Sequence, residues 1–283
     1  MPVSTKNWKW EMNFNIAKNS NKLIKLADGV DSYSIYWTSF STRLYNYAMV
    51  GKSLGVITGN TWERDDRGNI IFKKLGESQK ALYGGEYVPT YNQNTLDELG
   101  NFHPDFTGGF NTSISFKNFR LSANIDFSVG GQIVSYTNMW GSSSGILNKT
   151  AEINDRGINV REPVSKGGGI HMVGVDKEGN KVDTYVNAKL YYTTASNVWE
   201  EWVYDRTYVK LREVSLSYTV PSQALQKLKI GLSRASVAIN ASNPWLIYSA
   251  CPNVDASEMG MGYFEGGNAA ATRSVGFTVN LAF

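Results

Sequence analysis

The sequence has little cysteine and histidine and no long apolar run, and each shortage excludes a class of protein. Cys251 is the only cysteine among 283 residues, so neither an internal disulfide nor a cysteine-based zinc site can form. His103 and His171 lie far apart, with no Glu/His motif around either, which favours satisfied loop histidines over metal ligands. No stretch approaches the roughly 18 to 20 apolar residues of a membrane helix. No nucleophile motif surrounds any serine, and the sequence predicts no enzyme, cofactor or metal site.

Charge of either sign is also sparse. The formal net charge is +3, and the 28 Lys and Arg residues are scattered, which argues against a nucleic-acid partner. Aromatic residues are plentiful at 13%, with 16 Tyr and 8 Trp, whereas only 7 prolines occur. This bias suits strands and boundaries between water and an apolar medium better than helical bundles.

Apolar and polar residues alternate with a period of two over residues 8–16, 119–129 and 275–283. The apolar positions are Trp8, Trp10, Met12, Phe14 and Ile16, then Phe119, Leu121, Ala123, Ile125, Phe127 and Val129, then Val275, Phe277, Val279, Leu281 and Phe283. A strand points successive side chains to opposite faces, so each segment is predicted to have one apolar and one polar face. Asn13, Asn15, Asn124 and Asp126 are expected on the polar face.

One hairpin follows from arithmetic. If Lys117-Asn118 is a two-residue turn, residue 116 pairs with 119, 114 with 121, 112 with 123 and 110 with 125. Every pair then joins residues of the apolar face, so turn length and pattern predict the same register.

Residues 207–220 allow two interpretations. Val214, Leu216, Tyr218 and Val220 share their parity with Lys210 and Arg212. A bulge near Arg212 would switch the faces. In the simpler interpretation, which we prefer at this point, the upper part of the strand extends out of the apolar layer and carries Lys210 and Arg212 outward.

The links between strands are unequal. Short links are predicted at 17–21, at Lys117-Asn118 and at 221–228, where Leu225 and Leu228 have the spacing of a single helical turn. Long polar links are predicted at 141–205 and 243–271, with β-turns at 66–69 and 176–180. The carboxylates between Asp176 and Asp183 also have a loose calcium-like spacing, but a plain turn is favoured because an EF-hand's terminal Glu is missing.

This pattern fits a soluble β-sandwich or lectin-like barrel as well as an outer-membrane barrel. The second is favoured by aromatic-rich apolar faces, short turns at one end with long loops at the other, and a final aromatic residue, Phe283.

Several blocks resemble one family. Residues 208–221, Tyr-Val-Lys-Leu-Arg-Glu-Val-Ser-Leu-Ser-Tyr-Thr-Val-Pro, resemble the late-barrel signature of SusC/RagA-type TonB-linked outer-membrane proteins. Residues 237–245 look like that family's next strand, which ends in Asn243 at the loop. Residues 251–258 stand where the family has Gly-x-Asp-Pro-Glu and depart from it. Residues 8–26, 50–55 and 100–106 are also similar, so the resemblance is collinear over nearly the whole chain.

The resemblance implies an all-β fold, an antiparallel transmembrane β-barrel segment with long extracellular loops and short periplasmic turns. We expect residues 1–283 to form the C-terminal part of the barrel, with about nine or ten of roughly 22 strands, including weaker strands between Lys22 and Phe72. Since Met1 to Lys6 lead directly into strand-like sequence without a signal peptide, the plug domain and the segment that contacts TonB are expected before Met1.

The implied function is import of a bulky nutrient, an oligosaccharide or a peptide, across the outer membrane of a Gram-negative bacterium. The implied partners are a SusD-like lipoprotein lid, the TonB complex, the barrel-assembly machinery and outer-membrane lipid. A passive porin and a secreted soluble β-sandwich that binds glycans remain as alternatives.

Candidate ligand contacts are aromatic residues of the long links. They are Tyr191, Tyr192, Trp199, Trp202 and Tyr204 near the end of one link, and Trp245 and Tyr248 at the start of the other. Flat rings with a polar edge can stack on sugars or hold peptide side chains. The alternative is that they form an aromatic girdle or pack loop against loop. Phe283 is expected to be a signal read by the barrel-assembly machinery, rather than an ordinary strand end.

Overall fold

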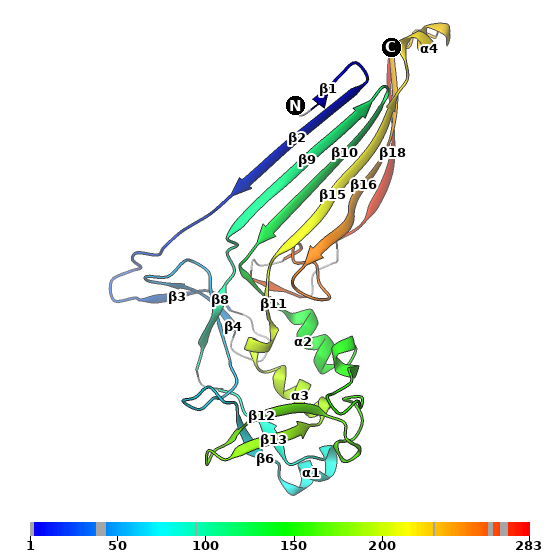
Figure 1. Ribbon diagram of the computed structural model, residues 1–283. Helices are drawn as coiled ribbons and strands as arrows, with labels where there is room; N and C mark the ends of the chain where they lie inside the picture. Colours follow the sequence, from blue (N-terminus) through cyan, green and yellow to red (C-terminus); the bar gives the residue numbers. More distant parts are fainter. Residues whose placement is uncertain (1–2, 38–43, 94, 229, 260–262, 267–270) are drawn as a thin grey trace.

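The computed structural model describes residues 3–37, 44–93, 95–228, 230–259, 263–266 and 271–283. It consists mostly of strands and divides into two parts (Figure 1). A slanting sheet of long strands forms one part, which we call the wall. The described residues of the segments 18–105, 130–207 and 250–273 leave one end of the wall and fold together as the second part, which we call the loop body.

The wall is an antiparallel sheet of seven strands in the order β1-β2-β9-β10-β15-β16-β18. Its strands are β1 (Val3–Ser4), β2 (Trp8–Ala17), β9 (Phe106–Phe116), β10 (Phe119–Val129), β15 (Tyr208–Thr219), β16 (Arg234–Ser249) and β18 (Ser274–Ala282). Each long strand pairs with the next long strand along the chain, so the wall is a meander interrupted by the segments of the loop body.

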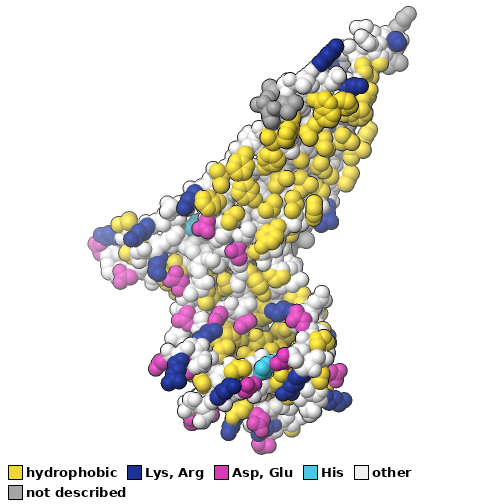
Figure 2. Space-filling model, in the orientation of Figure 1, with side chains coloured by type: hydrophobic (Ala, Val, Ile, Leu, Met, Phe, Trp, Pro, Cys, Tyr) yellow, Lys and Arg dark blue, Asp and Glu magenta, His cyan; other side chains and the backbone are white. Residues whose placement is uncertain are grey.

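The register places the apolar residues in continuous rows across the wall. One row joins Trp10, Ile114, Leu121, Leu216, Ile239 and Phe277. A neighbouring row joins Asn13, Asn111, Asn124, Glu213, Ser242 and Ser274 on the opposite face. The predicted hairpin pairs are confirmed, from Phe116 with Phe119 to Phe110 with Ile125. Apolar side chains cover the wall broadly in Figure 2, and Phe277 is 68% exposed.

Two sequence-based expectations for the wall are wrong. The strands between Lys22 and Phe72 were expected to be part of the barrel wall. The strands found there, β3 to β6, instead belong to sheets of the loop body that are separate from the wall. These strands are short. β5 is buried on both faces, and in β4 the less buried face carries Tyr45, Tyr47 and Met49, so apolar–polar alternation could not assign them. The link at 17–21 was expected to be short, yet β2 ends at the loop-body side, opposite Thr107, and the chain does not return to the wall until Phe106.

The remaining links at the short end agree with expectation. The turn at Lys117-Asn118 joins β9 to β10, and Lys117 has a φ of 52°. The predicted helical turn is α4 (Ser222–Leu228), between β15 and β16. Where the second long link was expected from residue 243, β16 instead continues to Ser249 with register shifts near its end.

β15 contains a β-bulge at Arg212, which was the less favoured of the two interpretations of residues 207–220. The register to β10 shifts between Asn124 and Ile125, which face Glu213 and Leu211, so Arg212 is the extra residue. Past the bulge Leu211 joins the apolar row of Ile125, while Lys210 pairs with Asp126 on the polar face. The expectation that Lys210 and Arg212 are carried outward is therefore wrong.

The loop body has three small sheets. The first contains β3 (Ser32–Trp37), β4 (Leu44–Met49), β5 (Val56–Gly59) and β8 (Asp97–Asn101). The second contains β13 (Lys181–Val186), β12 (Ile170–Asp176), β6 (Ile71–Lys74) and β7 (Tyr87–Pro89). The third contains β14 (Val203–Asp205), β11 (Gln132–Ser135) and β17 (Phe264–Glu265).

Short helices connect and cover these sheets. They are α1 (Glu77–Tyr83), α2 (Tyr136–Ser143) and α3 (Ala188–Ala195), with 3-10 turns at Asn148–Ala151, Val164–Lys166 and Trp199–Trp202. Among the described residues, no helix has the length and apolar character needed to cross a membrane.

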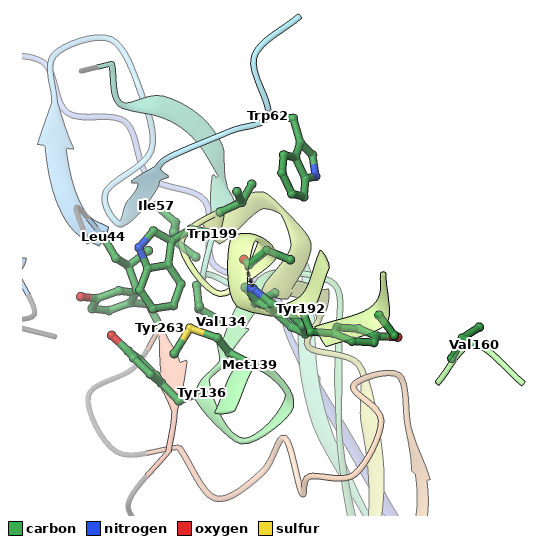
Figure 3. Packing of buried hydrophobic residues seen from close by; sticks show 14 residues of the cluster. Leu44, Ile57, Trp62, Val134, Tyr136, Met139, Val160, Tyr192, Trp199 and Tyr263 are labelled. Atoms are coloured by element: carbon green, nitrogen blue, oxygen red, sulfur yellow. Dashed lines mark hydrogen bonds between the residues drawn. The ribbon is translucent and has the colours of Figure 1, made fainter. Parts of the chain in front are cut away.

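The main hydrophobic core lies in the loop body, around Trp199. Its indole lies among Leu44, Ile57 and Tyr263, and the ring of Tyr136 meets it edge-on at 5.1 Å between centroids (Figure 3). Gly59 makes this packing possible, because a Cβ at that position would lie only 2.8 Å from the Cβ of Trp199. The segments 18–105 and 130–207, far apart in sequence, are thus held together by one core.

Candidate functional site

The polar face of the wall carries charged and amide side chains in ordered rows. A depression of about 360 Å³ lies there, lined among others by Glu11, Asn111, Arg120, Asn124 and Glu213. Glu11 forms an ion pair of 2.7 Å with Lys9 and lies 3.5 Å from Arg120. This face offers charged and amide groups to water or to a polar solute, whereas the opposite face is mostly apolar.

A cluster of five charged or polar side chains joins β15 to residues 251–258. Lys210 is 2% exposed, and its Nζ lies 2.7 Å from both Asp255 Oδ2 and Glu258 Oε1. Arg212 donates to both oxygens of Asp126 at 2.8 and 3.0 Å and to Glu258 Oε1 at 3.0 Å. The cluster therefore clamps this segment to the polar face of the wall.

The carboxylates of the clamp are held in their charged form. Burial alone would raise the pKa of Asp255, but hydrogen bonds from Lys210 and Ser257 outweigh it and lower that pKa. Hydrogen bonds from Lys210 and then Arg212 lower the pKa of Glu258. A buried lysine with two carboxylate partners is a strong anchor, since losing either side leaves a charge unpaired.

The same segment is also fixed at its other end. Asn138 of α2 donates to the carbonyl of Pro252 at 2.8 Å and accepts from Asn253 at 2.8 Å. Cys251 is buried beside it, and burial raises the pKa of its thiol to about 12. Residues 251–258, which depart from the family's sequence element, are thus a docked segment with a defined structure.

The five aromatic residues predicted near the end of the first long link lie together in the loop body. Trp199 and Trp202 are 0% and 1% exposed, and Tyr192 is 6% exposed. Tyr191 stacks on Trp62 at 6.1 Å between centroids, and Tyr204 packs beside Ile133. Burial raises the pKa of Tyr192 and of Tyr204 to about 12. Packing of loop against loop, the alternative drawn from the sequence, describes Trp199, Trp202 and Tyr204, whereas Tyr191 and Tyr192 also line cavities.

Trp245 and Tyr248 occupy a different surface. Both lie within β16, where Trp245 pairs with Leu211 and Tyr248 with Val209 on the apolar face of the wall. They are 58% and 51% exposed. Their positions at the loop-body end of the wall correspond to the aromatic-girdle alternative. Phe283 follows β18 and is 83% exposed.

The remaining sequence candidates are resolved by their contacts. Asp176 caps the β12–β13 turn by accepting from the backbone of Glu178 and Asn180, which confirms the plain turn. His171 has a carboxylate at each ring nitrogen, Asp155 at 2.7 Å and Asp183 at 2.8 Å. It is therefore satisfied, as expected, but it lies in strand β12 and not in a loop. His103 Nε2, by contrast, is buried without a hydrogen-bond partner in the described part of the chain. Within those residues no cluster of three His, Cys, Asp or Glu could hold a metal ion.

Two cavities open on the loop body. One of about 310 Å³ is lined by Tyr191, Tyr192, His171 and Asp155 among others. The other, of about 410 Å³, lies between α1, the end of α2 and the start of α3, and includes Tyr83 and Arg161 in its lining. Tyr191 and Tyr192, which the sequence analysis named as candidate ligand contacts, line these cavities, whereas the other lining residues come from segments whose packing alternation does not predict.

Comparison with known proteins places these features in context. The chain is 26% identical over 264 residues to TonB-dependent receptor P3 of Formosa agariphila, covering 89% of this chain and 24% of that protein. It is 24% identical over 263 residues to TonB-dependent receptor P26 of the same organism, covering 85% and 23%. The chain thus spans about a quarter of the length of the curated relatives it matches. No family model matches it.

Solved structures support the fold. The structure named as the RagAB peptide transporter superposes with a TM-score of 0.61 at 14% identity, over 99% of this chain and 28% of that chain. The closed-closed state of the RagAB peptide importer gives 0.62 at 13% identity, over 99% and 28%. The relatives are named as receptors and transporters. The resemblance to SusC/RagA-type TonB-linked outer-membrane proteins, indicated by the sequence motifs, is confirmed.

Proposed function

We propose that this chain forms part of the wall and outer loops of an outer-membrane, TonB-dependent transporter that imports a bulky nutrient, a peptide or an oligosaccharide. The observation that carries the proposal is the continuous apolar face of the wall. Rows from Trp10 to Phe277 and from Phe14 to Trp245 leave large apolar side chains exposed on every long strand.

Such a face is costly in water. Apolar burial is worth roughly 25 cal/mol per Å², and soluble monomers seldom expose contiguous apolar patches beyond a few hundred Å². Lipid chains remove the cost, while the polar face opposite remains available to a water-filled lumen. This division favours a transporter wall over the secreted sandwich, because in a sandwich the apolar face would be covered by a second sheet.

The edges of the wall support the same proposal. Within the described residues, β1 and β18 are edge strands, each with only one neighbour. An open edge inside a bilayer leaves backbone N–H and C=O groups unsatisfied, so further strands are needed to close a barrel. The chain covers about a quarter of its curated relatives, which leaves length for those strands and for a plug.

The proposed partners follow from the family. TonB would supply energy through the part of the protein outside this chain, and a SusD-like lipoprotein would cover the loop body as a lid. The solved relatives are named as peptide transporters, which makes a peptide one of the two substrate classes.

Phe283 is proposed as a signal for the barrel-assembly machinery. Replacing Phe283 by Ser in the full-length protein is expected to lower its outer-membrane level sharply. Phe277→Ser, within β18, is the control. It removes a similar apolar area, worth about 1.5 to 3 kcal/mol, and is expected to lower the outer-membrane level less than Phe283→Ser does. Equal outer-membrane levels of the two variants would leave Phe283 as an ordinary strand residue.

The orientation of the proposed transporter can be tested with two epitope insertions in the full-length protein. One is placed between Lys177 and Glu178, at the tip of the β12–β13 hairpin in the loop body, and the other between Lys117 and Asn118. The proposal predicts antibody labelling of intact cells for the first insertion and labelling only after permeabilisation for the second. Labelling of both in intact cells, or export of the protein to the medium, would contradict it.

A further inference from the structure

The cavity of about 410 Å³ in the loop body adjoins the main core through Tyr192. It lies where the end of α1, the end of α2 and the start of α3 meet, with Tyr83, Ser142, Arg161, Asn187, Lys189 and Tyr192 in its lining. Its size falls within the range of sites for small ligands or for one unit of a larger ligand.

The charge of this cavity is one-sided. Arg161 and Lys189 line it, and none of the described residues in the lining is Asp or Glu. Arg161 donates to neutral groups, namely the carbonyl of Thr150 at 2.8 Å, the hydroxyl of Thr150 at 2.6 Å and the carbonyl of Gly145. No ion pair of Arg161 or Lys189 with a carboxylate is found in the described part of the chain. Cations in a concavity without counter-charges attract an anion.

A second, independent observation points to a missing partner. Ser142 is 1% exposed, and its hydroxyl oxygen is buried without a hydrogen-bond partner among the described residues. Buried hydroxyls in folded proteins nearly always have a partner. Ser142 is among the residues that line the cavity, so a hydrogen-bond acceptor bound there is a candidate partner for its hydroxyl.

The start of α3 adds to the same preference. Asn187 caps this eight-residue helix by accepting from the backbone N–H groups of Lys189 and Leu190, and Ala188 lies in the cavity lining. The N-terminus of a helix carries partial positive charge and favours anions. The rings of Tyr83 and Tyr192 provide apolar surface for the carbon atoms that carry the anionic group.

We infer that this cavity binds a carboxylate group of the imported nutrient, with Arg161 and Lys189 opposite its charge and Ser142 donating a hydrogen bond. The inference rests on the proposed function, because it assigns a contact of the nutrient to the loop body. Two sources share this chemistry, the terminal carboxylate of a peptide and the carboxylate of a uronic acid sugar.

The test measures binding to the purified full-length protein in detergent by calorimetry. The probes are N-acetyl-dialanine and its amide, and a galacturonic acid dimer and its methyl ester. At least one carboxylate probe is expected to bind, and its neutral counterpart to bind at least about tenfold more weakly. The carboxylate that binds more tightly identifies the source.

Three variants sharpen the result. Lys189→Glu reverses the charge in the lining, suits the helix dipole and is expected to weaken binding about tenfold or more. Lys177→Glu is the matched control, since Lys177 lies at the tip of the β12–β13 hairpin outside the lining. Ser142→Ala removes a buried unpaired hydroxyl, so it is expected to fold normally and to bind several-fold more weakly.

The inference is overturned if neither carboxylate binds, if the neutral probes bind equally, or if Lys177→Glu weakens binding as much as Lys189→Glu. These outcomes are separable from those of the proposed function. A protein that is displayed on the cell surface and imports its nutrient, but binds no carboxylate, contradicts this inference alone. Binding of a carboxylate by a protein absent from the outer membrane contradicts the proposed function alone.

Discussion

The wall and the loop body use apolar residues in opposite ways. Nearly all of the large, fully buried side chains are in the loop body, including Trp199, Trp202, Tyr263 and Phe72. In the long strands of the wall, Ala235 is the only apolar residue in the buried core of the described chain. The wall instead presents residues such as Phe14 and Phe277 on its surface.

The difference is the one that the proposed function requires, with water around the loop body and lipid against the apolar face of the wall. The loop body excludes water by packing its own segments, as a soluble protein does. Among the described residues, the wall has no apolar layer that covers this face, and under the proposed function lipid covers it. The clamp of Lys210 and Arg212 lies at the boundary and joins the two parts through hydrogen bonds and ion pairs.

The largest effect is expected from Trp199→Ala in the loop body. Removing a fully buried indole should lower the free energy of unfolding of the loop body by about 3 to 5 kcal/mol. Trp140→Ala, at a position 53% exposed in α2, is the control and should cost less than about 1 kcal/mol. Protease susceptibility of the loop body in denaturant measures both. Equal effects would refute a water-excluding core around Trp199.

A smaller effect is expected from charge on the wall. Leu121→Arg places a cation on the apolar face of β10 and should destabilise the folded protein in lipid by about 2 to 4 kcal/mol. Ser122→Arg, the next residue of the same strand, faces the polar side beside Ser215 and should be tolerated. Folding yield into liposomes distinguishes them. A wall whose two faces tolerate arginine equally does not separate lipid from water.

The smallest effect concerns acid and the clamp. Because the folded-state pKa values of Asp255 and Glu258 are lowered, their stabilisation is present above the unfolded values of about 3.9 and 4.3 and is lost as pH falls through the lowered values. Residues 251–258 should then loosen, and buried Cys251 should react with a dithiodipyridine reagent.

Lys210→Met supplies the control for the acid prediction. This variant removes the central cation of the clamp, so Cys251 should already react near pH 7, with little further increase in acid. Reactivity of Cys251 that is independent of pH in the unaltered protein and unchanged in Lys210→Met would show that the clamp does not hold this segment.

The long strands of the wall could be predicted from sequence because their two faces meet different environments. Period-two alternation survives wherever one face is apolar and the other polar, and the register of the Phe116–Phe119 hairpin followed from turn length and this pattern together. β5 is buried on both faces, and β4 has Asn46 on its buried face and two tyrosines on the half-buried face. Neither strand therefore alternates apolar with polar residues, and their sheet could not be separated from the wall.

The candidate sites were less predictable, for a related reason. Aromatic residues near the end of a loop suggested ligand contacts, but Trp199 and Trp202 are buried by segments more than a hundred residues away, such as Leu44 and Ile57. The bulge at Arg212 was visible in the sequence only as a break in alternation. The contact of Lys210 with Asp255 and Glu258 on the polar face could be seen only in the folded structure.

The most direct test of the two-solvent description is a nitroxide scan along β10. Single labels are placed at each position from Arg120 to Ile125 of the full-length protein in liposomes, and collision with oxygen is compared with collision with a water-soluble nickel chelate. Cys251 remains in place, because its thiol is buried and its pKa is raised to about 12. We predict oxygen accessibility at Leu121, Ala123 and Ile125, and nickel accessibility at Arg120, Ser122 and Asn124. Equal nickel accessibility at all six positions would contradict a wall with one face in lipid.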